Sequence, residues 1–232
     1  MDPVCEDLER VLDIDSDCKS IGVHVAYTVA WKPSEQLKLD EKVIDKEISS
    51  LLEEVGERYD LESLKENPVV RAYRSFFWRI GIDPTKTRPA SEALLRRAIR
   101  GAFPRINPVV DAGNIASART LVAIGIYDLD RAMPPLRIVM SSGGELFKPI
   151  GGKERVVPRG VPIMVDSRGV VMHLYPHRDS VETCVSDRTE RVLIVAAGVS
   201  GVPRDLVISA VNEVVRILRK LGWQSCGKVL VK

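Results

Sequence analysis

The sequence predicts an α+β fold in which helices come first and a strand-rich core follows. Between residues 35 and 101 apolar side chains recur at helical spacing, whereas from about residue 119 short runs rich in valine and isoleucine alternate with Gly and Pro. Residues 203–221 have the apolar stripe of one long amphipathic helix. Helices, then many short strands, then a closing helix indicate α+β, not a parallel doubly wound sheet.

The element boundaries follow from local signals. Residues 21–30 alternate apolar and small or polar side chains, as a half-buried strand does. Helices are expected at 34–59, 67–81, 91–101 and 203–221. Ser91 is expected to cap the third of these helices, and Gly222 to end the last. Residues 106–199 are expected to form the strand-rich core.

Length and composition favour one soluble globular unit. We expect a single domain over residues 1–232, with a core at about 70–222 and an N-terminal strand and helical extension at 1–69. No apolar run approaches the roughly 20 residues that span a bilayer, and no signal peptide is recognisable. We therefore expect a cytoplasmic protein without membrane contact.

The four cysteines, Cys5, Cys18, Cys184 and Cys226, have no CxxC spacing and no neighbouring histidine pair. That scatter favours four ordinary free thiols over a disulfide framework and predicts no metal site.

A strongly basic segment spans residues 71–105. It holds nine basic residues and two acidic ones, Asp83 and Glu92, for a local charge of +7. Such a segment is typical of a surface that binds a nucleic-acid backbone, and the expected contacts are Arg88, Arg96, Arg97 and Arg100. The alternative is a solvated helix face paired with residues 35–66, which carry eleven acids and five bases.

Polar residues interrupt the apolar stretch at 106–117. Pro108 disfavours helix for Asn107, so we expect residues 106–111 to be extended or a turn, with Asp111 and Asn114 capping the segment that follows. Asn114 and Ser117, one helical turn apart, are better placed to face a cavity. Farther along the chain, Glu145 follows SSGG and Asp166 precedes SRG. For both residues a role in a turn is preferred, and a place in the pocket is the alternative.

A second polar cluster lies in VVMHLYPHRDS, residues 170–180. His173 and His177 are four residues apart, Pro176 indicates a turn between them, and Arg178, Asp179 and Thr183 follow. One interpretation is a polar pocket wall, and the other is a hairpin tip at the surface. Two histidines and one aspartate are too few to predict a metal.

Several longer motifs occur in a fixed order: INPVVDAGNIAS at 106–117, GIYDLDRAMPPLRIVMSSGGELFKPIGGKE at 125–154 and VPIMVDSRGVV at 161–171. Over residues 70–199 the chain resembles the B3/B4 domain of the bacterial phenylalanyl-tRNA synthetase beta subunit, and GIDPTKTRPASEALLRR at 81–97 resembles stand-alone members of that family. In the synthetase this domain is the editing module, which hydrolyses tyrosine mistakenly attached to the phenylalanine tRNA. The resemblance implies an α+β fold, a pocket between sheets, no metal and no cofactor. A chain of 232 residues has no room for the synthetase's own catalytic domain.

Two polar positions of the editing pocket are missing here. The family histidine ahead of the Tyr-Asp-Leu-Asp turn aligns with Gly125 or a neighbour, and the family glutamate with Ala196 or Ala197. Polar side chains from other parts of the sequence must therefore take the place of these two groups. Our candidates for a shared catalytic cavity are Asn114, Glu145, His173 and His177. The candidate substrate-pocket residues are Asn107, Asp111, Ser117, Tyr127, Asp166, Arg178, Asp179 and Thr183.

These observations favour a protein associated with tRNA or aminoacyl-tRNA, and a trans-acting deacylase for mischarged tRNA is the leading hypothesis. An aminoacyl ester is already activated, so its hydrolysis needs little more than an oriented water and donors for the oxyanion. Two alternatives remain open: a non-catalytic module that binds RNA or protein, and a small binder or hydrolase of amino-acid derivatives. No DNA is expected as a partner. The amino acid, the tRNA and the oligomeric state are not determined by the sequence.

Overall fold

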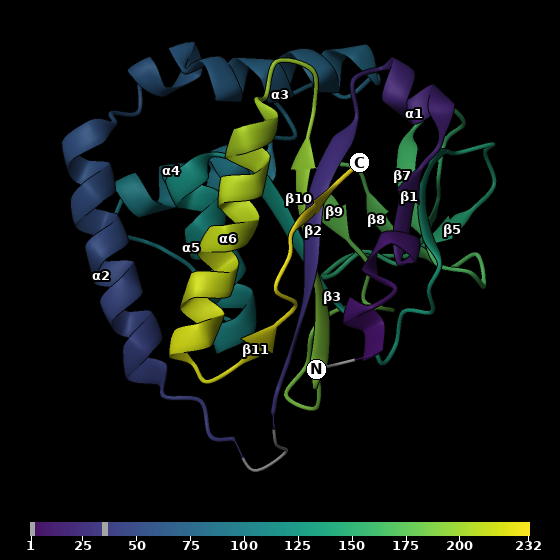
Figure 1. Cartoon of the computed structure of the whole chain (residues 1–232). Helices are drawn as coiled ribbons and strands as arrows, with labels where there is room; N and C mark the ends of the chain where they lie inside the picture. The colour runs from purple at the N-terminus through teal and green to yellow at the C-terminus, as the bar shows by residue number, and fades with distance from the viewer. Residues whose placement is uncertain (1–2, 34–36) are drawn as a thin grey trace.

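The computed structural model describes residues 3–33 and 37–232, in which two β-sheets lie against each other with helices outside one of them (Figure 1). The central sheet has the order β11-β2-β10-β3, and β12 also pairs with β2. Its strands are β2 (His24–Trp31), β3 (Ala123–Asp128), β10 (Arg191–Gly198), β11 (Gln224–Ser225) and β12 (Leu230–Val231). All of its pairs are antiparallel.

The second sheet has the order β1-β4-β7-β8-β9 and is mixed, because β1 runs parallel to β4. Its strands are β1 (Leu12–Ile14), β4 (Leu136–Met140), β7 (Pro162–Val165), β8 (Val171–Leu174) and β9 (Arg178–Asp179). A separate two-stranded sheet joins β5 (Leu146–Phe147) to β6 (Arg155–Val156). The α+β class predicted from the sequence is therefore confirmed. The segment before residue 70 supplies a strand to each of the two large sheets.

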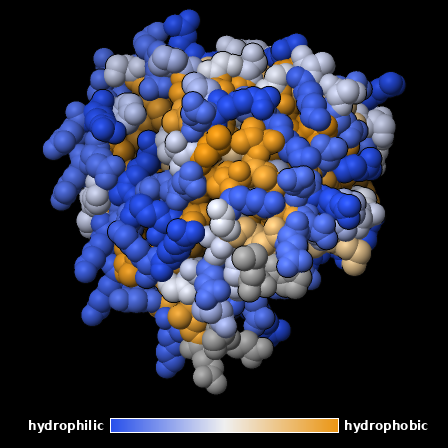
Figure 2. Space-filling view, viewed as in Figure 1, coloured by the Kyte–Doolittle hydropathy of each residue, from blue (hydrophilic) through white to orange (hydrophobic). Residues whose placement is uncertain are grey.

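Four helices of the described chain lie on the side of the central sheet that faces away from the second sheet: α2 (Glu41–Arg58), α4 (Ala90–Ile99), α5 (Pro108–Thr120) and α6 (Arg204–Lys220) (Figure 1). Helix α3 (Pro68–Arg79) crosses the top of the view, and α1 (Ser16–Ser20) contacts β4 of the second sheet. Short 3-10 turns lie at Pro3–Cys5, Leu8–Arg10 and Ser63–Glu66. Helix α6 packs on β2 and β10, and α5 packs on β3. Hydrophilic side chains dominate the face viewed in Figure 2, while apolar ones gather near its centre. No helix in the described ranges is long and apolar enough to cross a membrane.

The predicted strand at 21–30 and the predicted helices all occur, with shifts at their ends. The first predicted helix was placed from residue 34. Residues 34–36 lie outside the described part of the chain, and α2 starts at Glu41. Ser91 does not cap α4, because the helix begins one residue earlier, after Pro89, and Ser91 is buried inside it.

The expectation that residues 106–111 are extended or a turn holds for Asn107, whose backbone is extended, but was wrong from Pro108 onward. Helix α5 begins at Pro108, and Asn107 is its N-cap, with its side chain accepting hydrogen bonds from the amides of Val109 and Val110. Proline fits the first helical position, since its missing N–H would have no partner there. Asp111 and Asn114 therefore lie within the helix and do not cap a later segment.

A buried ionic cluster ties α2 to α5 and α6. The carboxylate of Glu47 accepts hydrogen bonds from Arg216 (2.7 and 2.8 Å), Arg119 (2.7 Å) and Lys220 (2.8 Å). These bonds, led by those from Arg216, hold the pKa of the Glu47 carboxyl far below its ordinary value despite its burial. Since a buried carboxylate without partners would be costly, this cluster fixes where α2 lies on the helical layer.

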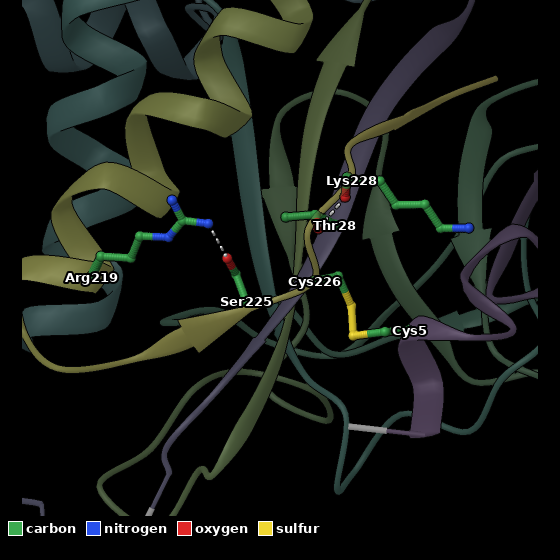
Figure 3. Close-up of a disulfide and its surroundings, with 6 residues drawn as sticks. All are labelled: Cys5, Thr28, Arg219, Ser225, Cys226 and Lys228. Carbon is green, nitrogen blue, oxygen red and sulfur yellow. Dashed lines mark hydrogen bonds between the residues drawn. A yellow bond between two sulfur atoms is a disulfide. The ribbon is translucent and has the colours of Figure 1, made fainter. Parts of the chain in front are cut away.

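The expectation of four free thiols was also wrong. Cys5 and Cys226 form a disulfide that joins positions 221 residues apart (Figure 3). Cys18 and Cys184 are free. Spacing along the chain could not reveal this bond, because its partners meet only after β11 and β12 bring the C-terminal segment onto β2.

Removal of this disulfide should destabilise the fold. Closing so long a loop restricts the unfolded chain, so Cys226→Ser should lower the free energy of unfolding by about 2–5 kcal/mol, measured by urea denaturation. Cys184→Ser, at a half-buried free thiol, is the matched control and should change it by less than about 1 kcal/mol. Four reactive thiols in the unfolded, unreduced protein, instead of two, would contradict the assignment.

Candidate functional site

A pocket opens between the two sheets. It is narrow, because only about 30 Å³ is open to the centre of a water molecule, although about 400 Å³ is free of protein atoms when its open mouth is counted. Its walls come from β3 and β10 on one side and from β4, β7, β8 and β9 on the other. Ala90, at the start of α4, also contributes to its wall. Most of the lining is apolar, and the polar groups come from Tyr127, His173, His177 and Asp179, with Tyr175 beside them.

The alternation of side chains along the central sheet determines what faces the pocket. In β3, residues 123, 125 and 127 point toward the second sheet, whereas Ile124 and Ile126 would be met by a side chain added at Gly113 of α5. In β10, Val195 pairs with Gly125 and Ala197 with Ala123, so both line the pocket. Of Ala196 and Ala197, only Ala197 therefore lines the pocket.

His173 and Asp179 form the polar centre of the pocket. They are directly opposite each other in the β8–β9 hairpin, and His173 Nδ1 lies 2.7 Å from Asp179 Oδ1. His173 is only 7% exposed. Because the carboxylate accepts a hydrogen bond from Nδ1–H, the neutral imidazole carries its lone pair on Nε2, which makes no hydrogen bond within the described residues. The interpretation of this segment as a surface hairpin tip was therefore wrong for His173.

Tyr127 completes this arrangement from the opposite sheet. Its hydroxyl donates to the same Oδ1 of Asp179 at 3.0 Å, and its ring meets that of His173 edge-on with centroids 6.0 Å apart. Burial, aided by Asp179, raises the pKa of Tyr127 well above its ordinary value, so the phenol remains protonated and donates. A Cβ at Gly125 would lie 2.1 Å from this hydroxyl. Glycine at position 125 thus leaves the space that the Tyr127 side chain fills.

His177 stands in the turn that joins β8 to β9, as Pro176 predicted. Its ring meets that of Phe77 edge-on at 5.4 Å, and its Nδ1 is buried without a hydrogen-bond partner in the described structure. Burial, with a smaller effect of His173, lowers the pKa of His177 to about 3. His177 is consequently neutral at physiological pH and can still donate or accept one hydrogen bond toward a ligand.

The shared cavity expected for four catalytic candidates contains only the two histidines. Asn114 lies on α5, behind the central sheet, and does not line the pocket. Glu145 also lies elsewhere. Its carboxylate closes its own turn by accepting from the Ser141 and Ser142 hydroxyls and from the Ser142 and Gly143 amides. These bonds hold its pKa low, at about 2.

Six of the eight predicted pocket residues do not line this pocket, and one of them, Arg178, instead donates to Ile150 O. Asn107 and Asp111 organise the start of α5, where the Asp111 carboxylate accepts from the Ile106 amide and from Arg105. Ser117 donates to Val122 O at 2.7 Å, and Asp166 holds its turn through the Arg168 and Val170 amides. The Thr183 hydroxyl is buried without a partner in the described ranges, but Thr183 is not a pocket wall.

The arginines predicted to bind nucleic acid fall into two groups. Arg88, Arg97 and Arg100 are exposed, and their side chains have no partner among the described residues. Arg96 instead donates to Glu92, which is fully buried and is also held by Arg74. The prediction that Arg96 points outward with Arg97 and Arg100 was wrong, because Glu92 lies one helical turn before Arg96 and neutralises it.

Two contributors were missed by the sequence analysis. Tyr175 joins the sheets by donating to the backbone oxygens of His24 (2.9 Å) and Gly198 (2.5 Å). Tyr73 of α3 donates to Ala197 O at 2.6 Å and fixes the end of β10. Their only signal was the aromatic content of their segments, which does not distinguish packing from polar contact. Within the described residues, no group of three or more His, Cys, Asp or Glu is arranged to hold a metal.

A side chain at position 125 should disrupt the pocket. Gly125→Ala places a methyl group where the Tyr127 hydroxyl lies, so it should cost about 1–3 kcal/mol in the free energy of unfolding, measured by chemical denaturation. In a Tyr127→Ala background the ring is gone, and the same change should cost much less. Equal costs in both backgrounds would contradict the contact.

The protonation of His177 should be visible by NMR. With a pKa of about 3 in the folded protein against about 6.5 in the unfolded chain, its imidazole should stay neutral above about pH 4. The unfolded state then binds one more proton between pH 3 and 6.5, so this residue should make the free energy of unfolding fall as pH drops through that window. The contribution of His177 to the slope of the free energy of unfolding against pH is at most about 1.4 kcal/mol per pH unit, and His177→Gln should lack this contribution. An imidazole that titrates near pH 6.5 would contradict this assignment.

Comparisons with known proteins agree with this architecture. The B3/4 domain family matches residues 72–222. The chain has the fold of an N-terminal fragment of the phenylalanyl-tRNA synthetase beta subunit from Pyrococcus horikoshii, with a TM-score of 0.52 and 19% sequence identity over 93% of this chain and 50% of that one. The chain thus spans about half the length of that fragment. No curated protein sequence matches it. The chain belongs to the B3/4 domain family.

Proposed function

We propose that the pocket hydrolyses an ester between an amino acid and the terminal ribose of an RNA, as a trans-acting deacylase. The single observation that carries this proposal is the His173–Asp179 pair, 2.7 Å apart, in a mostly apolar pocket between the sheets. A histidine oriented by a carboxylate is a general base that can activate water near neutral pH. The pair lines the same pocket as Gly125 and Ala197, two of the positions at which the resemblance implies that polar editing residues are missing.

The chemistry needs only groups that line this pocket. Water gives a proton to His173 Nε2 while its oxygen attacks the ester carbonyl, and Asp179 stabilises the imidazolium that forms. His177, neutral and unpartnered at Nδ1, can donate a hydrogen bond to the developing oxyanion. When the tetrahedral intermediate collapses, the bond to the ribose oxygen breaks and His173 returns the proton to that oxygen. The products are the free amino acid and the free RNA end.

Asp179 has a second role in binding. Its Oδ1 is shared by His173 and Tyr127, whereas its Oδ2 makes no hydrogen bond in the described structure. The carboxylate side chain is 36% exposed, which leaves Oδ2 open to the α-ammonium group of an aminoacyl ester. A substrate with an ammonium group beside its ester bond would therefore be oriented by the residue that orients the base.

The RNA body would be held by the exposed arginines near the pocket. Arg88 and Arg97 flank the start of α4 and its exposed face, and Ala90 at the start of that helix lines the pocket. Arg100 lies one turn farther along. These guanidinium groups have no internal partner in the described residues, so they are available to phosphates.

Removal of the general base should slow hydrolysis strongly without weakening RNA binding. We expect His173→Ala and Asp179→Asn each to lower the deacylation rate of a sensitive aminoacyl-tRNA by about 10²- to 10⁴-fold, with tRNA affinity nearly unchanged. Deacylation of a panel of mischarged tRNAs by purified protein is the measurement, and Asn114→Ala, outside the pocket, is the control. If the wild type releases no amino acid from any of them but still binds tRNA, the non-catalytic RNA-binding module takes the place of the deacylase.

The exposed arginines should govern the salt dependence of RNA binding. Arg97→Ala with Arg100→Ala should weaken tRNA binding and reduce the slope of log affinity against log salt by up to about two phosphate contacts. The free energy of unfolding should change by less than about 1 kcal/mol. Arg96→Ala is the contrasting variant, since it removes a partner of buried Glu92 and should destabilise the fold. An unchanged salt slope in the double variant would remove this face from the proposed interface.

A further inference from the structure

The pocket between the sheets has little room for the side chain of an amino acid. The part of it that is open to the centre of a water molecule measures about 30 Å³. One water needs about 10–15 Å³ of such space, so this part of the pocket holds about two waters. His173 and Asp179 line the same space. The reacting carbonyl group of an ester must therefore share it with the side chain of the amino acid.

The Tyr127 side chain fills the space beside the smallest residues of the central sheet. Gly125 and Ala197 line the pocket from this sheet and have little or no side chain. The side chain of Tyr127 turns back over Gly125, so that its hydroxyl and two of its ring carbons would clash with a Cβ added there. Tyr127 is only 2% exposed. Its ring thus occupies room that the two small residues would otherwise leave to a ligand.

Contacts with the second sheet hold this ring in place. The Tyr127 hydroxyl donates to Asp179 Oδ1 at 3.0 Å, and the ring meets that of His173 edge-on, with centroids 6.0 Å apart. The ring of His173 in turn meets that of Tyr175 edge-on at 6.0 Å, and the Tyr175 hydroxyl donates to backbone oxygens of the central sheet. The Tyr127 ring therefore cannot turn away from the pocket without giving up its hydrogen bond to Asp179.

The rest of the lining determines the polarity of the side chain that fits. In the proposed deacylase, Asp179 holds the ammonium group of the substrate and His173 faces its carbonyl group. The third substituent on the α-carbon is the side chain, which meets what remains of the wall. That wall includes Ile138 of β4, Met164 of β7 and Val195 of β10. Apolar surroundings of this kind favour a methyl group over a hydroxyl, which would lose its hydrogen bonds to water there.

We propose that Tyr127 restricts the pocket to amino acids with a small apolar side chain, represented by alanine, and excludes phenylalanine and tyrosine. This inference rests on the proposed function and names its substrate class. A well-packed wall makes room for extra atoms only at a cost, so a ring that is held on both sides rejects a larger side chain by overlap. Loss of the Tyr127 ring should therefore change which ester is preferred, whereas loss of its hydroxyl alone should not.

Kinetics with one RNA and several amino acids test the size limit. The same tRNA is charged with alanine or with phenylalanine, and kcat/KM for deacylation is measured after subtraction of the uncatalysed rate. We expect the wild type to prefer alanine by at least about tenfold. Tyr127→Ala should reduce that preference by at least about tenfold.

Two further variants at the same position make this result specific to the ring. Tyr127→Phe is the matched control, because it keeps the ring and should keep the preference even where loss of the bond to Asp179 lowers kcat for both esters. Tyr127→Leu shortens the side chain but keeps it apolar, and it covers the case in which Tyr127→Ala fails to fold. A preference for alanine that is unchanged in the folded Ala and Leu variants overturns the role of Tyr127. Equal kcat/KM of the wild type for both esters overturns the size limit while the deacylase stands.

Binding separates the size limit from the proposed reaction. Alaninamide and phenylalaninamide carry the ammonium group and the side chain but no ester, and their binding is followed by NMR through the imidazole signals of His173. We expect the wild type to bind alaninamide at least about tenfold more tightly than phenylalaninamide, and Tyr127→Ala to lose this difference. That result in a protein that hydrolyses neither ester supports the size limit and overturns the deacylase. Tighter binding of phenylalaninamide by the wild type overturns the size limit in any case.

Discussion

The burial of β10 on both faces is the constraint on which the rest of the structure depends. Its eight residues pair with all of β2 on one edge, and six of them pair with β3 on the other. Helix α6 packs on one face, while Val195 and Ala197 on the other face the second sheet. A strand enclosed in this way must be apolar throughout, and RVLIVAAG is nearly so. Its small residues leave the gap between the sheets that becomes the pocket.

That gap determines which side of the pocket supplies its polar groups. The central sheet presents Gly125 and Ala197, which have little or no side chain, and the second sheet projects His173 and Asp179 into the space. Tyr127 then turns back over Gly125 to reach Asp179. The polar centre therefore lies on the β8–β9 hairpin, and one carboxylate oxygen of Asp179 joins the two walls.

Ion pairing within the fold neutralises part of the basic segment. The basic segment at 71–105 looked like nine available cations, but Arg74 and Arg96 neutralise buried Glu92, and Arg105 pairs with Glu41, Asp45 and Asp111. Pairing with the acidic segment before it, which the sequence analysis left open as the alternative, therefore accounts for part of the excess. The other six basic residues of the segment make no ion pair among the described residues: Arg71, Arg79, Lys86, Arg88, Arg97 and Arg100. Net charge alone therefore overstated the number of unpaired cations.

The sequence by itself determined the fold class, the family and the four helices α2, α3, α4 and α6, because apolar periodicity, caps and motif order are local properties of the chain. It also singled out His173, His177, Tyr127 and Asp179. It could not place Asn114 and Glu145, since helix α5 lies behind the central sheet and Glu145 satisfies its own turn. The tertiary structure alone decided that Asp179 lies opposite His173, that Tyr127 fills the space at Gly125, and that Cys5 meets Cys226. Each of these contacts depends on strand register or on chain closure across long separations, and neither leaves a periodic signal in the sequence.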